Sequence, residues 1–240
     1  GIQEEAYLPY QGCSGFHSEY QRKQAAYRMT GSEMTLSVQT NSEQRAIKKR
    51  MMQNGGIYVA FHSDGANYYD NGTTYAYYQS DSSYYSANHA VLLVGWDDNY
   101  AKENFDPKEQ PENNGAWLVK NSWGDGKLDD GYFWISYEDT SLGEYASFTF
   151  EPREDSGNIY YYDGAGYSVA YSFNSVANVF RAEEDETLSR VGFYQTSYNG
   201  NNPKYQIQVY RLSETATDPT DGERLLNTTG YSGGFGYQEI

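Results

Sequence analysis

A histidine and an asparagine at the ends of two apolar segments are the residues best suited to catalysis. His89 stands at the start of the apolar run 90–96, and Asn121 follows the apolar segment 116–119. An imidazole can take up and return the proton of a nucleophile, and an amide oxygen can accept a hydrogen bond from one ring N–H and so orient the ring. Trp123 could shield that hydrogen bond from water. We therefore expect His89 and Asn121 to lie within hydrogen-bonding distance, with Trp123 packed over them.

The elements that must hold these residues are predicted to be short strands joined by glycine-rich turns. Continuous apolar runs predict buried strands, and glycines mark the turn that follows Asn121. The long segment 62–86 is rich in Tyr, Ser, Asn and Gly, which in a compact domain favours a binding surface. The predicted strands are 57–61, 89–96, 116–120 and 132–137.

A helix is predicted before the first of these strands. Asn41 is suited to cap it, and Gln44 at the third helical position can reach back to the cap. The helix should run to about Gln53, because Gly55 and Gly56 stop it.

Two strings around the candidate residues resemble the His and Asn signatures of the papain family of cysteine peptidases. They are NHAVLLVGWD at 88–97 and NGAWLVKNSWG at 114–124, and GYFWI at 131–135 continues the match. Residues 1–12 resemble the segment just after the nucleophile helix of that family, and residues 41–61 resemble the helix and strand that enter its β-barrel half. The resemblance covers about residues 1–150 and implies an α+β, papain-like fold, mostly its β-barrel half.

The resemblance also implies roles for individual residues. His89 would be the general base and acid, Asn121 would orient it, and Trp123 would support the pair. Ala60 and Asn88 would lie near the pocket for the second residue of the substrate, and small apolar walls there would suit a hydrophobic or aromatic side chain. The implied activity is Cys-His-Asn hydrolysis of peptide bonds in peptide or protein substrates, without cofactor or metal.

The expected nucleophile is not at the position that the family spacing requires. In the family it lies roughly 130–150 residues before the His and Asn, which places it roughly 40–60 residues before Gly1. Cys13 is the one cysteine, and its context GCSGF is a weak mimic of the motif that lies too close to His89. We expect Cys13 to be a half-buried loop thiol, although it stays the alternative nucleophile. The chain alone is therefore expected to be inactive, and the N-terminal segment is a candidate partner as a separate chain.

Composition excludes several other functions. The net charge is −16, so the phosphate backbone of nucleic acids and anionic membranes are disfavoured as partners. The longest apolar run, 90–96, is too short to span a bilayer. The acidic segments 97–106 and 125–130 lack the ordered spacing of a calcium loop, so we expect solvated loops and no metal site.

A second module is predicted after the charged break at 151–157. Short strands at regular spacing, separated by turns at Asn199–Gly200 and Asp221–Gly222, indicate a β-sandwich. Strings at 158–166, 177–194 and 205–212 resemble the lectin-like β domain that follows the peptidase in some secreted bacterial papain-like enzymes. The predicted strands are 159–162, 177–180, 188–194 and 205–212.

The resulting domain prediction is a papain-like domain at 1–152, lacking its nucleophile segment, and a truncated lectin-like β-sandwich domain at 158–240. Carbohydrate is a candidate ligand of the β domain, with a packing or spacer role as the alternative. By resemblance, the protein would be extracellular or at the cell surface of a bacterium.

Two functions from different classes compete. The first is a cysteine endopeptidase that is active in its full-length form. The second is a non-catalytic surface-binding protein on an inactive peptidase scaffold. The retained set of His89, Asn121 and Trp123 favours the first, because a dead enzyme has no chemical reason to keep it. A peptidase cut into two chains near Gly1 is a third alternative.

Overall fold

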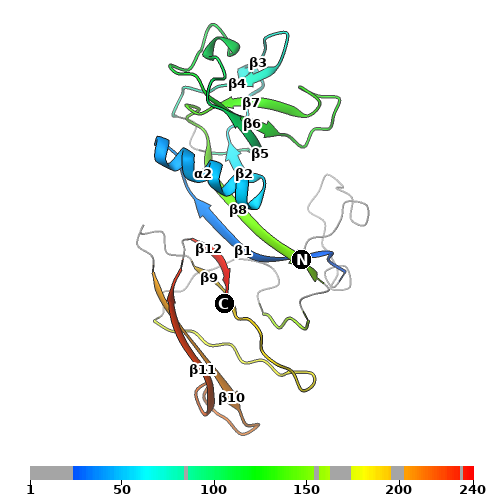
Figure 1. Cartoon of the computed structure of the whole chain (residues 1–240), viewed down its shortest axis with the longest axis vertical. Helices are drawn as coiled ribbons and strands as arrows, with labels where there is room; N and C mark the ends of the chain where they lie inside the picture. Colours follow the sequence, from blue (N-terminus) through cyan, green and yellow to red (C-terminus); the bar gives the residue numbers. More distant parts are fainter. Residues whose placement is uncertain (1–23, 84–85, 154–156, 163–173, 196–202, 233–234) are drawn as a thin grey trace. The chain divides into compact units, whose positions relative to one another are not determined.

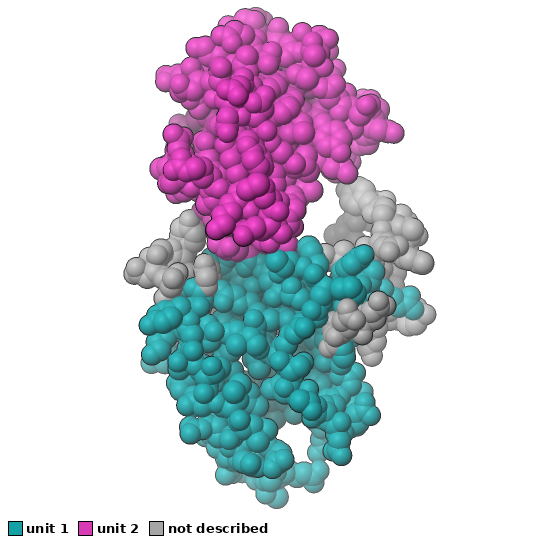
Figure 2. Space-filling model, in the orientation of Figure 1, with its two compact units in different colours: residues 1–32, 149–240 teal, residues 33–148 magenta. Residues whose placement is uncertain are grey.

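The computed structural model describes residues 24–83, 86–153, 157–162, 174–195, 203–232 and 235–240 (Figure 1). The chain forms two compact units, which Figure 2 distinguishes by colour. One is Glu33–Phe148, and the other joins the described part of residues 1–32 to Thr149–Ile240. Cys13 and His17 lie outside the described residues.

The unit Glu33–Phe148 is built on a mainly antiparallel sheet. Its strands follow the order β2-β5-β6-β7-β4-β3, and only the β4–β7 pair is parallel. At the β2 edge the sheet continues through β8 to β1. The bounds are β1 Tyr27–Thr35, β2 Ile57–Phe61, β3 Tyr68–Asp70, β4 Tyr75–Tyr77, β5 His89–Asp97, β6 Ala116–Lys120, β7 Tyr132–Ser136 and β8 Gly143–Pro152. The 3-10 turns η1 (Gly65–Asn67) and η2 (Lys102–Asn104) lie in the connections.

Alternate side chains of these strands form the core. Because successive residues of a strand point to opposite faces, β2, β5, β6 and β7 each send every second side chain to the same side. Those side chains are fully or almost fully buried, and they meet one face of the helix α2 (Asn41–Asn54). The buried strand residues are Ile57, Val59, Phe61, Val91, Leu93, Trp117, Val119, Phe133 and Ile135, and the helix contributes Ile47 and Met51.

The helix α2 confirms the predicted helix but corrects its cap. Thr40, rather than Asn41, is the N-cap residue, and its side chain accepts a hydrogen bond from the Glu43 N–H. Glu43, rather than Gln44, reaches back to the Thr40 N–H at 2.8 Å. A carboxylate is the stronger acceptor and also interacts favourably with the helix dipole, which explains the choice. The hydrogen bonds from Gln39 and Thr40 lower the pKa of Glu43.

Replacing Thr40 with Ala should lower the free energy of unfolding by about 1 kcal/mol, because the first turn loses its side-chain acceptor. Urea denaturation followed by circular dichroism measures the change. The matched control is Gln44→Ala, which removes the partner predicted from sequence and should change stability by less than about 0.5 kcal/mol. A larger loss for Gln44→Ala than for Thr40→Ala would contradict this capping arrangement.

The second unit holds two small antiparallel sheets. β9 (Gly192–Gln195) pairs with β12 (Gly236–Glu239), and β10 (Lys204–Leu212) pairs with β11 (Gly222–Tyr231). Arg28 forms ion pairs with Glu151 and Glu239, and Arg190 bonds to Glu151 at 2.7 Å. These ion pairs join β1 and β12 to the C-terminal end of β8 within this unit.

Two of the strands predicted for this module are wrong. Residues 159–162 and 177–180 form no strand, and the strand predicted at 188–194 begins only at Gly192. Their aromatic side chains instead contact one another without pairing of the backbones: the rings of Tyr162 and Phe180 stack at 4.9 Å. The strand predicted at 205–212 is confirmed as β10. No helix in the described ranges has the length and apolar character needed to cross a bilayer.

Candidate active site

The pairing of β5 with β6 brings His89 and Asn121 together. His89 is the first residue of β5, and Asn121 directly follows the last residue of β6. Because the two strands are antiparallel, the start of one lies beside the end of the other, with Leu92 opposite Lys120. The Asn121 N–H donates to the Gly131 carbonyl at 2.8 Å, which fixes the backbone after β6.

The predicted hydrogen bond between the two side chains is present. His89 Nε2 lies 2.9 Å from Asn121 Oδ1. An amide oxygen can only accept, so Nε2 carries the proton in this contact. Asn121 Oδ1 also accepts from the Ser122 N–H at 2.8 Å, which holds the amide in place. In the described part of the chain, Nδ1 of His89 makes no hydrogen bond and is free for a reacting group.

Two aromatic rings contact the imidazole. The Trp123 ring stacks on His89 with centroids 5.2 Å apart and planes 19° apart, as the sequence predicted. Phe61 contacts the imidazole with a centroid distance of 5.6 Å. Tyr68 in turn contacts Trp123 at 5.7 Å. Asn121 is only 7% exposed, whereas Trp123 is 47% exposed, so the tryptophan separates the His89–Asn121 hydrogen bond from solvent.

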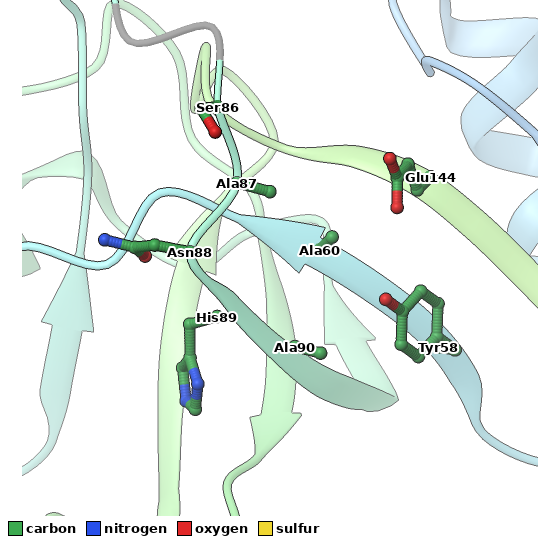
Figure 3. Close-up of a pocket in the computed structure, with 8 residues that line it drawn as sticks. All are labelled: Tyr58, Ala60, Ser86, Ala87, Asn88, His89, Ala90 and Glu144. Atoms are coloured by element: carbon green, nitrogen blue, oxygen red, sulfur yellow. The ribbon is translucent and has the colours of Figure 1, made fainter. Parts of the chain in front are cut away.

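A pocket of about 410 Å³ lies beside His89 (Figure 3). It brings together residues from β2, from the start of β5 and from β8, including the two predicted pocket residues, Ala60 and Asn88. The Asn88 amide points away from Ala60, because it exchanges hydrogen bonds with the Ser63 backbone at 2.7 and 3.1 Å. The lining residues are Tyr58, Ala60, Ser86, Ala87, Asn88, His89, Ala90 and Glu144.

Sequence reasoning missed several residues of this pocket, and Glu144 is the charged one among them. It lies on β8 directly after Gly143, and Gly143 is opposite Ala60 of β2. Only strand pairing brings it to the site, and no local motif marks it.

The other described histidine, His62, contacts the Ser86 carbonyl through Nδ1 at 3.1 Å. Among the described residues, no group of three or more His, Cys, Asp or Glu side chains could hold a metal ion.

Comparison with known families decides the assignment. The family model described as papain family cysteine protease matches residues 1–150, which is more than half of the chain. The chain belongs to the papain family of cysteine proteases. A model described as lectin like domain matches residues 159–240, directly after the papain-family part. Together they confirm the predicted papain-like fold followed by a lectin-like β domain.

Solved structures extend the papain-family likeness over both parts of the chain. A clostridial cysteine protease, Cwp84 after propeptide cleavage, matches with a TM-score of 0.74 and 25% identity over 99% of this chain and 58% of that chain. The cysteine protease and lectin-like domains of Cwp84, a surface layer associated protein of Clostridium difficile, match with a TM-score of 0.70 and 24% identity over 99% of this chain and 52% of that chain.

Curated relatives match a part of the chain. Mouse cathepsin J is 28% identical over 155 residues, which is 64% of this chain and 41% of cathepsin J. Mouse testin-2 is 37% identical over 90 residues, which is 37% of this chain and 24% of testin-2. The chain thus spans less than half the length of these relatives.

Proposed function

We propose that this chain carries the His and Asn of a cysteine endopeptidase, whose thiolate comes from a segment that precedes residue 1. The observation that carries the proposal is the 2.9 Å contact between His89 Nε2 and Asn121 Oδ1 under the Trp123 ring. This arrangement fixes one ring nitrogen as a donor and leaves the other to exchange a proton with a sulfur atom.

In the proposed mechanism, His89 Nδ1 takes the proton of the thiol and the resulting imidazolium stabilises the thiolate. The thiolate attacks the carbonyl carbon of the scissile peptide, and the same Nδ1–H then protonates the leaving amine as the C–N bond breaks. His89 next takes a proton from water, whose oxygen attacks the carbonyl carbon of the acyl-enzyme. The C–S bond then breaks, which releases the free acid, and His89 Nδ1–H returns its proton to the departing thiolate. Asn121 keeps the ring orientation through these proton transfers.

The proposed setting follows from the relatives. We assign residues 1–152 to the peptidase part and 158–240 to the lectin-like part, with carbohydrate as the candidate ligand of the latter. Because Cwp84 is a surface layer associated protein, we propose an extracellular or cell-surface location in a bacterium. Ala60 and Asn88 are assigned to the pocket for the second substrate residue. Its lining by Ala60, Asn88 and His89 supports this assignment.

The test uses the full-length protein that includes the segment before residue 1. A peptidyl epoxide that alkylates active thiolates should stop cleavage of a casein substrate and should label a cysteine in that preceding segment, as located by mass spectrometry. Cys13→Ser should keep the cleavage rate within about twofold, because we assign Cys13 no role in the reaction.

Two results would overturn the proposal. Labelling of Cys13, with loss of cleavage in Cys13→Ser, would make Cys13 the nucleophile. A full-length protein that neither cleaves nor reacts with the epoxide would indicate the non-catalytic surface-binding scaffold instead.

A further inference from the structure

The pocket beside His89 combines small walls with one negative charge. Alanines 60, 87 and 90 leave space where larger residues would fill it, and Tyr58 adds an aromatic surface. Its volume, about 410 Å³, falls within the range of roughly 300–1,000 Å³ that is typical of ligand pockets. Among the described residues that line it there is no Lys or Arg, and Glu144 is the one acidic residue.

The backbone holds Glu144 in a fixed position at the pocket. Its N–H donates to the Leu36 carbonyl at 3.0 Å, and its φ of 55° lies in the left-handed region, which is unfavourable for most residues other than glycine. Figure 3 shows the carboxylate directed toward Ala60 and Tyr58. The surrounding structure therefore maintains an unusual backbone conformation at the residue that brings the charge to this pocket.

The Glu144 carboxylate has no partner within the described residues. No hydrogen bond or ion pair reaches its oxygens there. Its negative charge acts on Tyr58 within the pocket. Burial raises the pKa of the Tyr58 hydroxyl, and the charge of Glu144 raises this pKa further. Filling the pocket with an apolar group would remove water from the carboxylate without replacing its hydrogen bonds, which is costly.

We propose that this pocket selects a basic side chain, Lys or Arg, on the peptide substrate, and that Glu144 is the residue that determines this preference. The inference rests on the proposed peptidase function. The methylene stem of Lys or Arg would lie against Tyr58 and the alanines, and the cationic head would reach the carboxylate. The small walls around Ala60 alone predicted a hydrophobic or aromatic side chain in this pocket, and the carboxylate of Glu144 changes this preference to a basic one. The net charge of −16 also favours the approach of cationic peptides.

The experiment compares two fluorogenic peptides on the full-length enzyme. They differ only at the second residue before the cleaved bond, which is Arg in one and the neutral, nearly isosteric citrulline in the other. The ratio of kcat/KM for Arg over citrulline should be about fivefold in the wild type, the size expected of one partly exposed charge pair, and should fall to about one in Glu144→Gln. Gln has the same side-chain length as Glu and must adopt the same positive φ, so Glu144→Gln is expected to fold like the wild type.

The matched control is Glu103→Gln, the same loss of charge at an exposed residue outside the pocket, which should keep the ratio of the wild type. Cleavage of both peptides with a ratio near one in the wild type, or an unchanged ratio in Glu144→Gln, would overturn this inference and leave the peptidase proposal standing. Absence of cleavage of every peptide, together with absence of epoxide labelling, would instead refute the proposed function.

Discussion

Replacing His89 with Ala is expected to lower kcat of the full-length protein by roughly 10³-fold or more, because the thiol and the leaving amine both lose their proton partner. The loss should appear in kcat rather than in KM, since His89 exchanges protons during the reaction and Ala60 and Glu144 remain to bind substrate. Initial rates on a fluorogenic peptide measure it. Circular dichroism should show an intact fold, because the Phe61 and Trp123 rings keep their other aromatic neighbours.

The chain offers a matched control in its other described histidine. His62→Ala removes an imidazole whose Nδ1 contacts the Ser86 carbonyl, on the loop that leads to His89. It should change kcat by less than about tenfold, because His62 has no role in proton transfer. If His89→Ala kept more than about a tenth of the wild-type kcat, the role assigned to His89 would be wrong, whatever the family of the chain.

The His89–Asn121 contact could be predicted from sequence because the strings around both residues resemble the His and Asn signatures of the papain family. The structure shows the physical basis, since antiparallel pairing of β5 with β6 places the start of one strand beside the end of the other. Glu144 could not be found in this way. It reaches the pocket through the pairing of β8 with β2, and its own segment, GEYASF, carries no sign of which strand it will join.

The errors in the second unit have a different physical origin. Alternating aromatic residues predict a strand because they suit a half-buried sheet surface. At 159–162 the aromatic residues make side-chain contacts without forming a strand. The Tyr160 hydroxyl donates to Glu186 at 2.8 Å, and Tyr162 stacks on Phe180. The helix cap was misassigned by one residue because Thr40 and Asn41 are both good caps, and only the backbone geometry distinguishes them.

Removing the carboxylate of Asp139 should destabilise the unit Glu33–Phe148 strongly. Asp139 is 7% exposed and accepts hydrogen bonds from the Gln79 N–H at 2.9 Å and from the Ser141 N–H and hydroxyl at 2.9 and 2.7 Å. Thr140 also donates to the Gln79 carbonyl through its N–H and its hydroxyl. Asp139 therefore connects the segment after β4 to the segment after β7 through hydrogen bonds.

Asp139→Ala leaves these donors inside the protein without an acceptor, so the free energy of unfolding should fall by about 3 kcal/mol. Asp139→Asn keeps one oxygen and should cost less, about 1–2 kcal/mol. Urea denaturation measures both, and Glu103→Ala, an exposed acid, should change stability by less than about 0.5 kcal/mol. A loss below about 1 kcal/mol in Asp139→Ala would show that the hydrogen bonds of Asp139 contribute little to the free energy of unfolding.

The pH dependence of the same variants tests whether burial governs this carboxyl. Burial raises the pKa of Asp139 from its ordinary value of 3.8 to about 7, against the opposing effect of the hydrogen bonds from Ser141 and Gln79. Between about pH 4 and pH 7 the folded protein then keeps a proton that the unfolded chain has released. The contribution of Asp139 to stability is therefore lost as the pH rises through this window, by up to about 1.4 kcal/mol per pH unit.

Asn carries no proton that titrates in this range, so the stability of the wild type relative to Asp139→Asn should be greatest at about pH 4 and smallest at about pH 8. Taking the difference cancels the carboxyls whose pKa is lowered, such as Asp98 beside Lys48, which stabilise the fold as the pH rises. An advantage of the wild type that grows toward pH 8 would mean that the donors from Gln79 and Ser141 outweigh burial. Asp139 would then be held as a carboxylate, and the link between the β4 and β7 segments would be strongest in its charged form.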